Sequence, residues 1–518
     1  MRRTLFLLVL GALLVLAGPL LAAAQPAGRV VIAQGVDPTT LDPHNHEESP
    51  AYNVLLNLYD TLLFRDKDLK IIPWLAESWR AVNPTTWEFK IRKGVKFHNG
   101  EEVDADAVKF SLERIIAPEL KMRQAPNFTL IDKIETPDKY TVRVVTKKPF
   151  PTLENQLALR GAIVPPKYFR EKDGPTLAKT PIGSGPFKFV RWAKDEAITM
   201  EANESWWGGA PKIKTLVIRP IPEHTTRVAA LQTGEVDVVT NVPPHLVKQV
   251  EADAKLYISK APSVRVIYIW IYTHKYDKEH KVLGPVDWHT KDKRVRQALN
   301  YAVNIDEVIK NVLEGNGIRV GTVLTSKHFG FDPKIQPIKQ DVAKAKQLLA
   351  EAGYPNGVDL VLNSPDGRYL KDKEVSEAIG GQLSKAGIRT TVKTHEWGTY
   401  LNQMTYVHGA GPIALIGWGN TTWDADGTLT PLFQTGKLLS NYHNEQFDSL
   451  INEAATTVDP KARLGLYSKA LQIWVDDGAS IPLYQQMDIY GVSKRVKFQA
   501  LSSEQLVGPW ICLADQKC

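Results

Sequence analysis

Residues 358–397 place a helix pattern between two strand patterns, and this order restricts the fold more than any other feature of the chain. VDLVLNS (358–364) is typical of a buried strand, and IRTTVKTHEW (388–397) alternates apolar and polar residues at its start. Between them, DKEVSEAIGGQLSKAG (372–387) carries Val375, Ile379 and Leu383 on one helical face and ends at a glycine. The order of these patterns predicts a strand, a helix and a second strand.

Two more segments extend the same order. GTYLNQMTYVH (398–408) can form a helix, and PIALIGWG (412–419) is a short apolar strand. Strand, helix, strand, helix and strand in succession predict an α/β fold with a mostly parallel sheet and helices on both faces. Ligands of such sheets bind outside the carboxyl ends of the strands. The segment GWGNTTWDADGTL (417–429), rich in aromatic and acidic residues, begins at such an end and is therefore a candidate site.

Similar patterns occur earlier in the chain. TWEFKIRKGVKF (86–97) and YTVRVVT (140–146) have the two-residue period of strands. TTRVAALQTGEVDVVT (225–240) predicts a helix that ends near Gly234, followed by a short strand. In the segment 292–315 we expect two helices, the second capped by Asp306 and ending at Gly315.

The first residues have the composition of a secretory signal. Arg2 and Arg3 precede an apolar run from Leu5 to Leu21, and three alanines then offer a cleavage site before Gln25. We therefore expect a signal peptide over residues 1–24, with a membrane anchor as the alternative. No cysteine at that site could carry a lipid, and no later apolar run of about 20 residues follows. The sequence predicts a soluble periplasmic protein.

Charge and cysteine content narrow the class of protein. The formal charge of +7 comes from interspersed acidic and basic residues, and no stripe of one sign suggests nucleic-acid binding. The length of 518 residues is enough for two or three domains. The two cysteines, Cys512 and Cys518, lie in the last seven residues. In an oxidising periplasm we expect them to form a local disulfide, with two free thiols as the alternative.

Motifs of catalysis or cofactor binding are absent from the sequence, so we assign no catalytic residue and expect no cofactor and no metal. IGSGPF (182–187) lacks the spacing of a hydrolase nucleophile elbow, and neither a Walker A motif nor a well-placed dinucleotide fingerprint occurs. In PHNHEE (43–48), His44, His46 and Glu47 could bind a metal ion, although two histidines in a loop are more often only polar groups.

Eight segments together carry a family resemblance over nearly the whole chain after the signal region. They are TLDPHNHEESPAYNVLLNLYDTL (40–62), IIPWLAESWR, WEFKIRKGVKFHNGEEVDADAVKFSLER, TPIGSGPFKFVRW, WWGGAPKIKTLVIRPIPEHTTRVAALQTGEVDVV, DKRVRQALNYAVNIDEVI, VAKAKQLLAEAGYPNG and GQLSKAGI. In this order they resemble the dipeptide-, oligopeptide- and nickel-type solute-binding proteins of ABC importers, which form family 5 of the extracytoplasmic solute-binding proteins.

The resemblance implies a bilobal periplasmic binding protein fold with a hinge. Lobe I would span residues 25–271, with an inserted subdomain at about 46–180, and lobe II residues 272–485. Residues 486–518 would return to lobe I. The chain would cross between the lobes near SVRVIYIWIYT (263–273) and IPLYQQMDIYGV (481–492). Ligand binding would close the lobes, and the closed form would dock on a membrane permease that two cytoplasmic ATPases drive.

The resemblance also indicates where a ligand's ammonium group could bind. Peptide-binding relatives place an aspartate soon after a Gly-Trp pair, whereas here Thr421 stands at the expected position after Gly417-Trp418. The carboxylates follow later, at Asp424 and Asp426, and one of them could hold the ammonium; the alternative is a solvated turn or a helix cap. The loop resembles a subgroup whose ligands are glutathione-like, opine-like or short peptides.

Further contacts are expected from residues on the same edge of the predicted sheet. Arg368 could pair with a ligand carboxylate, and Trp397, Trp418 and Trp423 could wall the pocket through apolar and cation–π contacts. Glu47 occupies a position where relatives have a loop that lines the cleft. For each of these residues, ordinary core packing or an exposed position is the alternative.

The sequence therefore predicts a periplasmic receptor, not an enzyme, that binds a peptide or peptide-like solute and delivers it to an ABC permease. We expect a monomer that does not bind nucleic acid. The alternatives are a nickel-chelate or opine receptor on the same fold and, from another class, a secreted hydrolase.

Overall fold

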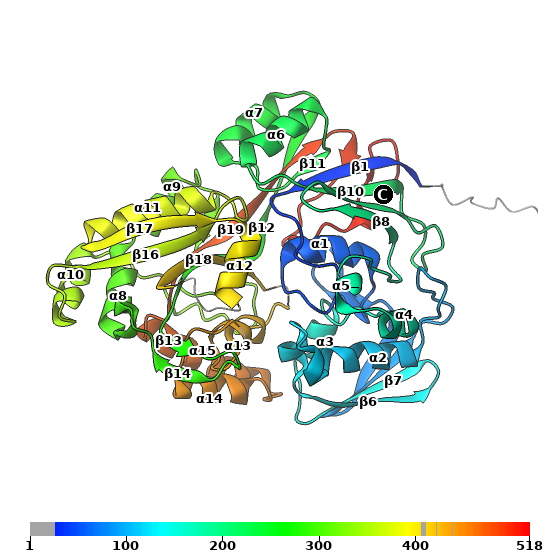
Figure 1. Cartoon of the computed structure of the whole chain (residues 1–518), viewed down its shortest axis with the longest axis horizontal. Helices are drawn as coiled ribbons and strands as arrows, with labels where there is room; N and C mark the ends of the chain where they lie inside the picture. The colour runs from blue at the N-terminus through cyan, green and yellow to red at the C-terminus, as the bar shows by residue number, and fades with distance from the viewer. Residues whose placement is uncertain (1–25, 406–410, 421, 438) are drawn as a thin grey trace, which may run out of the picture.

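The computed structural model describes residues 26–405, 411–420, 422–437 and 439–518. Figure 1 shows two bodies side by side, joined by long strands that pass between them. We call the body built on β16, β17 and β18 lobe II, and the body built on β1, β8, β9 and β10 lobe I.

One sheet runs through both lobes. Its strand order is β17 (Ile388–His395), β16 (Val358–Pro365), β18 (Ile413–Gly419), β12 (Leu256–Ile271), β19 (Ser480–Ser493), β11 (Val238–Val239), β1 (Ala27–Gln34), β10 (Ile213–Pro220), β9 (Ala197–Ala202) and β8 (Phe187–Ala193), with β15 (Gly317–Arg319) paired to β19. Because β12 and β19 belong to both lobes, they form the mechanical connection between them.

Lobe II has the predicted α/β order. β16 pairs in parallel with β17 and with β18, and α11 (Asp372–Lys385) and α12 (Trp397–Thr405) connect the three strands. The apolar face of α11 is fully buried, and Gly387 ends the segment with φ of +90°. The α/β fold class is confirmed, while residues 406–408 of the expected second helix lie outside the described residues.

The expected cap of one lobe II helix was wrong. Helix α9 (Ile305–Asn311) begins after Asn304, whose side chain accepts a hydrogen bond from Glu307 N, whereas Asp306 lies inside the first turn. Asn304 has the extended backbone that a cap needs, and both residue types are good caps, so the sequence alone did not separate them.

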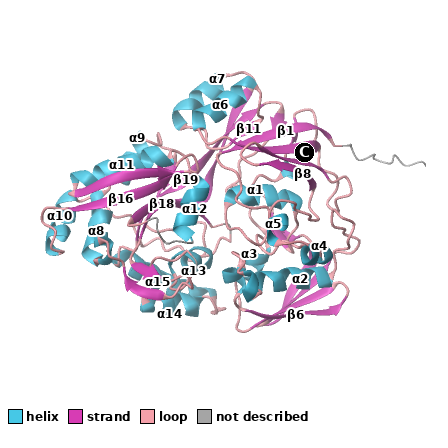
Figure 2. Ribbon diagram, in the orientation of Figure 1, coloured by secondary structure: helices cyan, strands magenta, loops and turns pink. Residues whose placement is uncertain are grey.

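The remaining helices are distributed between the lobes (Figures 1 and 2). Lobe I carries α1 (Ser49–Leu58), α3 (Leu153–Leu157), α4 (Pro166–Glu171), α5 (Gly174–Leu177), α6 (His224–Thr233) and α7 (Val247–Ala252). Lobe II carries α8 (Lys293–Ala302), α10 (Val342–Glu351), α13 (Asp426–Phe433), α14 (Glu445–Ala454), α15 (Pro460–Asp476) and the hairpin of β13 (His274–Tyr276) and β14 (Val282–Pro285).

A separate four-stranded antiparallel sheet lies at the end of lobe I, within the expected inserted subdomain. Its order is β4 (Ala76–Asn83), β5 (Thr86–Ile91), β7 (Thr141–Thr146) and β6 (Ile131–Asp138), and α2 (Ala105–Ile116) packs on it. This unit has its own apolar core. The small sheet of β2 (Leu63–Arg65) and β3 (Ile71–Pro73) leads into it.

The pairing of β12 with β19 breaks at the passage between the lobes. β12 pairs with Met487–Ser493 before the break and with Ser480–Gln485 after it, and its register shifts between Pro262 and Val266. β18 pairs only with the part after the break. The break overlaps the first expected crossover, 263–273, and precedes the expected lobe boundary at residue 271.

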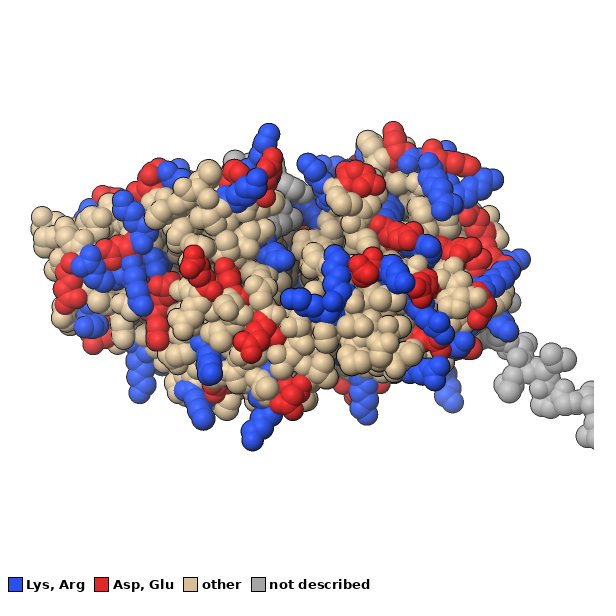
Figure 3. All heavy atoms as spheres, turned by 90° about the horizontal axis from the view of Figure 1, so that it is seen from below, with Lys and Arg blue, Asp and Glu red and all other residues tan. Residues whose placement is uncertain are grey.

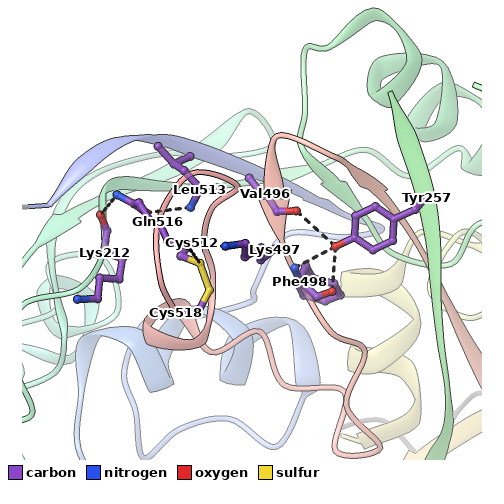
Figure 4. The surroundings of a disulfide bond; sticks show 9 residues. All are labelled: Lys212, Tyr257, Val496, Lys497, Phe498, Cys512, Leu513, Gln516 and Cys518. Carbon is purple, nitrogen blue, oxygen red and sulfur yellow. Dashed lines mark hydrogen bonds between the residues drawn. A yellow bond between two sulfur atoms is a disulfide. The ribbon is translucent and has the colours of Figure 1, made fainter. Parts of the chain in front are cut away.

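The C-terminal tail packs on lobe I and closes on itself (Figure 4). Cys512, in β21 (Cys512–Leu513), forms a disulfide with Cys518, as expected, and β21 pairs with β20 (Val496–Lys497). Gln516 Nε2 donates to Lys212 O at 3.0 Å. On the other side of the tail, the Tyr257 hydroxyl donates to Phe498 O at 3.0 Å. These bonds hold the returning chain against lobe I.

The surface has the mixed charge that the sequence indicates. Figure 3 shows acidic and basic side chains interspersed over the visible face. Among the described residues, no helix has both the length and the apolar character that a membrane span requires.

Candidate functional site

A pocket lies between the two lobes. Lobe I contributes the start of α1 together with Asn127 and Arg160. Lobe II contributes Arg368, Trp397 and Trp418, and the crossover strand β12 contributes Arg265. The cavity has a volume of about 90 Å³. Groups from both lobes would therefore contact one occupant, as a site that forms by closure requires.

The lobe II side of the pocket is the carboxyl edge of the parallel strands. Arg368 and Tyr369 follow β16, Trp397 follows β17, and Gly417–Gly419 form the end of β18. This is the edge that the strand order indicates as the binding edge of such a sheet. The three predicted residues Arg368, Trp397 and Trp418 are thus brought together.

Arg368 presents an uncommitted cation. Its guanidinium lies 4.8 Å from the ring centre of Tyr369 and 5.1 Å from that of Trp397, and its Nε atom is buried without a hydrogen-bond partner. Burial and the neighbouring Arg265 lower the pKa of Arg368. Within the part of the chain that the structure describes, no carboxylate pairs with it. The group is poised to receive an anion from a ligand.

Trp397 connects the lobes directly. Its indole Nε1 donates to Glu48 Oε2 at 2.8 Å, and the other oxygen of Glu48 accepts from the backbone and the hydroxyl of Thr39 at 2.7 and 2.6 Å. Arg65 of lobe I also donates to Thr422 O of lobe II at 3.1 Å. These contacts show that the two lobes touch across the cleft in this structure.

Glu47 lines the pocket, as expected, but its charge is already paired. Arg160 Nη2 donates to Glu47 Oε2 at 2.6 Å and Arg160 Nε to Glu47 Oε1 at 2.9 Å, while Asn127 Nδ2 donates to Oε1 at 3.0 Å. Glu47 therefore serves mainly to hold Arg160 and Asn127 at the pocket wall.

Of the two loop tryptophans, only Trp418 lines the pocket. Its Nε1 donates to Gly427 O at 2.8 Å, which fixes the ring. Trp423 has φ of +61° and stacks on His328, with ring centres 5.5 Å apart, outside the pocket lining. Thr421 lies outside the described residues.

Asp424 is paired away from the pocket. Its carboxylate accepts from Arg463 at 2.5 and 2.8 Å, and both side chains are buried. Oδ1 also accepts from the backbone N of Asp426 at 3.0 Å, so Asp424 serves the start of α13. Helix α13 begins after Ala425, and no side chain caps it. The buried ion pair with Arg463 is therefore neither the solvated turn nor the helix cap that the sequence left open, and we omit Asp424 from the proposed ligand contacts.

Asp426 faces a neighbouring cavity. Its Oδ1 accepts from Thr430 at 2.6 Å, and burial together with Asp424 raises its pKa. The cavity also shares Asn127 and Lys437 with the central pocket. Contact between Asp426 and a ligand stays a prediction.

Sequence reasoning missed a buried ion pair at the crossover. Arg265 Nε donates to Glu504 Oε1 at 2.7 Å, and Arg265 Nη2 also donates to Glu504 Oε2. The same guanidinium reaches Gly417 O at 2.7 Å and Ser49 Oγ at 2.8 Å, so it joins both lobes. One signal was present, because Arg265 is the single charged residue in the apolar run VRVIYIWIY.

The pocket wall carries more cationic than acidic side chains. Its described lining includes Arg123, Arg160, Arg265, Arg368 and Lys437, against Glu47 and Glu48. Such a wall favours an occupant with one or more carboxylates.

The two histidines considered as metal ligands are buried elsewhere. His44 contacts Ala162 O at 2.7 Å and Arg114 at 2.8 Å, and burial lowers its pKa to about 4. His46 packs against Tyr52, with ring centres 4.3 Å apart. Across the described ranges, no group of three or more potential metal ligands occurs.

Comparison with known proteins places this geometry in context. The model of the bacterial extracellular solute-binding proteins, family 5 middle, matches residues 70–439. The chain is 32% identical over 461 residues to the glutathione-binding protein GsiB of Pectobacterium atrosepticum, covering 86% of each chain.

Solved structures agree with this. The chain superposes on the periplasmic binding protein DppA of Helicobacter pylori in complex with the peptide STSA, with a TM-score of 0.85 and 27% identity over 95% of this chain and 99% of that one. It superposes on AgaA of A. tumefacien R10 in complex with agropinic acid with a TM-score of 0.83 and 25% identity, over 95% and 99% of the two chains.

Proposed function

Because this chain belongs to family 5 of the bacterial extracellular solute-binding proteins, we propose that it captures a peptide-like solute bearing at least one carboxylate. The solute would bind between the lobes, and the closed protein would deliver it to the permease of an ABC importer. The family consists of binding proteins of such importers.

The observation that carries the ligand class is the unpaired guanidinium of Arg368 between Tyr369 and Trp397. Arg368 is half-buried and its Nε atom is fully buried, so the missing counter-ion is costly, and an anionic ligand group would relieve that cost. The cationic excess of the wall supports the same class, and the aromatic rings offer apolar contact to the rest of the solute.

The relatives named above bind glutathione, a peptide and agropinic acid. All three serve as probes for this chain. We further propose that residues 1–24 are a cleaved signal peptide, that the mature protein works as a monomer in the periplasm, and that Arg368, Trp397 and Trp418 contact the solute. No observation favours a nickel-chelate site or a hydrolase.

Calorimetry with glutathione, the peptide STSA and agropinic acid tests the proposal. We expect one of them to bind, and Arg368→Gln to weaken that binding about 30-fold, because a charged hydrogen bond in a closed pocket is lost. The matched control is Arg389→Gln, which removes an exposed arginine of β17 that pairs with Asp359. Binding unchanged by Arg368→Gln would contradict the role of Arg368, and binding of none of the three probes would contradict the ligand class.

A further inference from the structure

A second, smaller cavity lies where the crossover strands pass between the lobes. It shares Ser49, Asn53, Arg265 and Arg368 with the central pocket, so the two spaces adjoin. On its other side it is lined by residues of β19, among them Gln486 and Asp488, by Glu504 of the returning chain, and by lobe I residues that follow β1. We call this space the hinge cavity.

Two buried acceptor atoms of the hinge cavity lack donors. Asp488 is 4% exposed and Gln486 is 3% exposed. Gln486 Nε2 donates to Asp488 Oδ1 at 2.5 Å, while Asp488 Oδ2 and Gln486 Oε1 have no hydrogen-bond partner. Ser263 lies close, but its hydroxyl donates its single proton to Glu504. Unpaired buried acceptors of this kind call for a donor-rich occupant.

Among the charged groups that line the hinge cavity, the carboxyl group of Asp488 and the guanidinium of Arg368 have no described partner of opposite charge. Glu504 is neutralised by Arg265, which donates to both of its oxygens. Arg368 has no described carboxylate partner and lines the same cavity as Asp488. The carboxyl group of Asp488 and the guanidinium of Arg368 face one small space without described partners of opposite charge. Together they are complementary to a compact zwitterion, whose ammonium group would favour ionisation of Asp488.

We propose that the hinge cavity binds a free α-amino-acid end of the solute, with the ammonium on Asp488 and Gln486 and the carboxylate on Arg368. This inference rests on the proposed function and narrows its ligand class. A γ-glutamyl peptide such as glutathione carries both groups on one carbon atom. In an ordinary α-linked peptide they lie at opposite ends of the chain, so only the former could place both in this cavity.

The protonation state of Asp488 provides a measurable sign that an ammonium group binds there. Burial and the neighbouring Glu504 raise its pKa well above the usual range, and the other titratable groups facing the cavity are Arg265, Arg368 and Tyr490. A bound ammonium would favour the ionised carboxylate and so lower this pKa. Ligand binding should therefore release a proton wherever the pH lies between the pKa values of the free and bound protein.

The experiment is calorimetry in two buffers of different ionisation enthalpy, with glutathione and with glutathione acetylated on its amino group. For the wild-type protein we expect the acetylated form to bind at least about 10-fold more weakly, and proton release to accompany only the unmodified ligand. In Asp488→Asn, the two ligands should bind equally well and neither should release a proton. In Gln486→Met, the difference in affinity between the two ligands should become smaller. Asp359→Asn, on the outer surface of lobe II, is the matched control.

Several results would overturn the inference. Equal binding of the two ligands by the wild-type protein would do so, as would a difference that survives in folded Asp488→Asn. Binding of STSA or agropinic acid without glutathione would reject the hinge subsite but keep the proposed function. Binding of no probe would reject the proposed function and, with it, the subsite.

Discussion

At the scale of single residues, the pocket separates charges that are already paired from those that are not. Arg265 and Glu504, and Arg160 and Glu47, each neutralise one another. Arg368 has no described carboxylate partner, and this difference supports the ligand role that we propose for it. Residue type alone carries no such information, because all three arginines have the same side chain.

The ion pair of Asp424 with Arg463 predicts that Asp424 contributes to stability and not to ligand binding. Asp424→Asn should lower the free energy of unfolding by about 3 kcal/mol, because Arg463 is left buried without its partner. Urea unfolding measures this effect. The exposed pair of Asp359 and Arg389 supplies the control, since Asp359→Asn should leave the midpoint unchanged.

The opposite pattern for Asp424→Asn would show that this residue is a ligand contact after all. In that case stability would be unchanged, while the affinity for the solute would fall at least about 10-fold.

At the scale of elements, the strand and helix order of residues 358–419 could be predicted because each element has its own periodicity. The terminal disulfide could be expected as well, because the two cysteines are close in sequence and no others occur. The passage of β12 and β19 through both lobes could not be predicted from periodicity, since a strand's pattern does not say which strands lie beside it.

The disulfide closes the chain that follows β21 back onto that strand, and its contribution to stability can be measured. Cys518→Ser should lower the free energy of unfolding by roughly 2 kcal/mol, because the unfolded tail gains freedom. Neither cysteine lines the pocket, so ligand affinity should not change. The wild-type protein treated with a reductant should match the variant in urea unfolding; a variant as stable as the oxidised protein would contradict the role of the bond.

At the scale of the whole molecule, one of the contacts between the lobes is a close approach of two glycine backbones. A Cβ atom on Gly35 of lobe I would lie 2.1 Å from the carbonyl oxygen of Gly367 in lobe II. The absence of a side chain at Gly35 therefore permits the contact between the lobes. In a form with the lobes apart, the same Cβ atom would meet no such obstacle.

Gly35→Ala should accordingly hinder closure. We expect solute affinity to fall at least about 10-fold and small-angle X-ray scattering to show a smaller compaction on ligand addition than in the wild type. The control is Gly381→Ala in α11, where an added Cβ meets no atom within 4 Å. Normal compaction and affinity in Gly35→Ala would show that the two loops do not limit closure.

The sequence by itself determined the α/β class and the family, because periodicity and motif order are local properties of the chain. It favoured a tail disulfide over two free thiols, and the structure shows the bond. It also placed Arg368, Trp397 and Trp418 on one edge, since parallel strands end at a common side of a sheet. Only the tertiary structure decided which charges are free. Asp424 is matched by Arg463, 39 positions later in the chain, and Glu504 by Arg265, 239 positions earlier, while Arg368 and Asp488 remain unmatched. Pairing over such separations depends on how the lobes and helices pack, which no local pattern encodes.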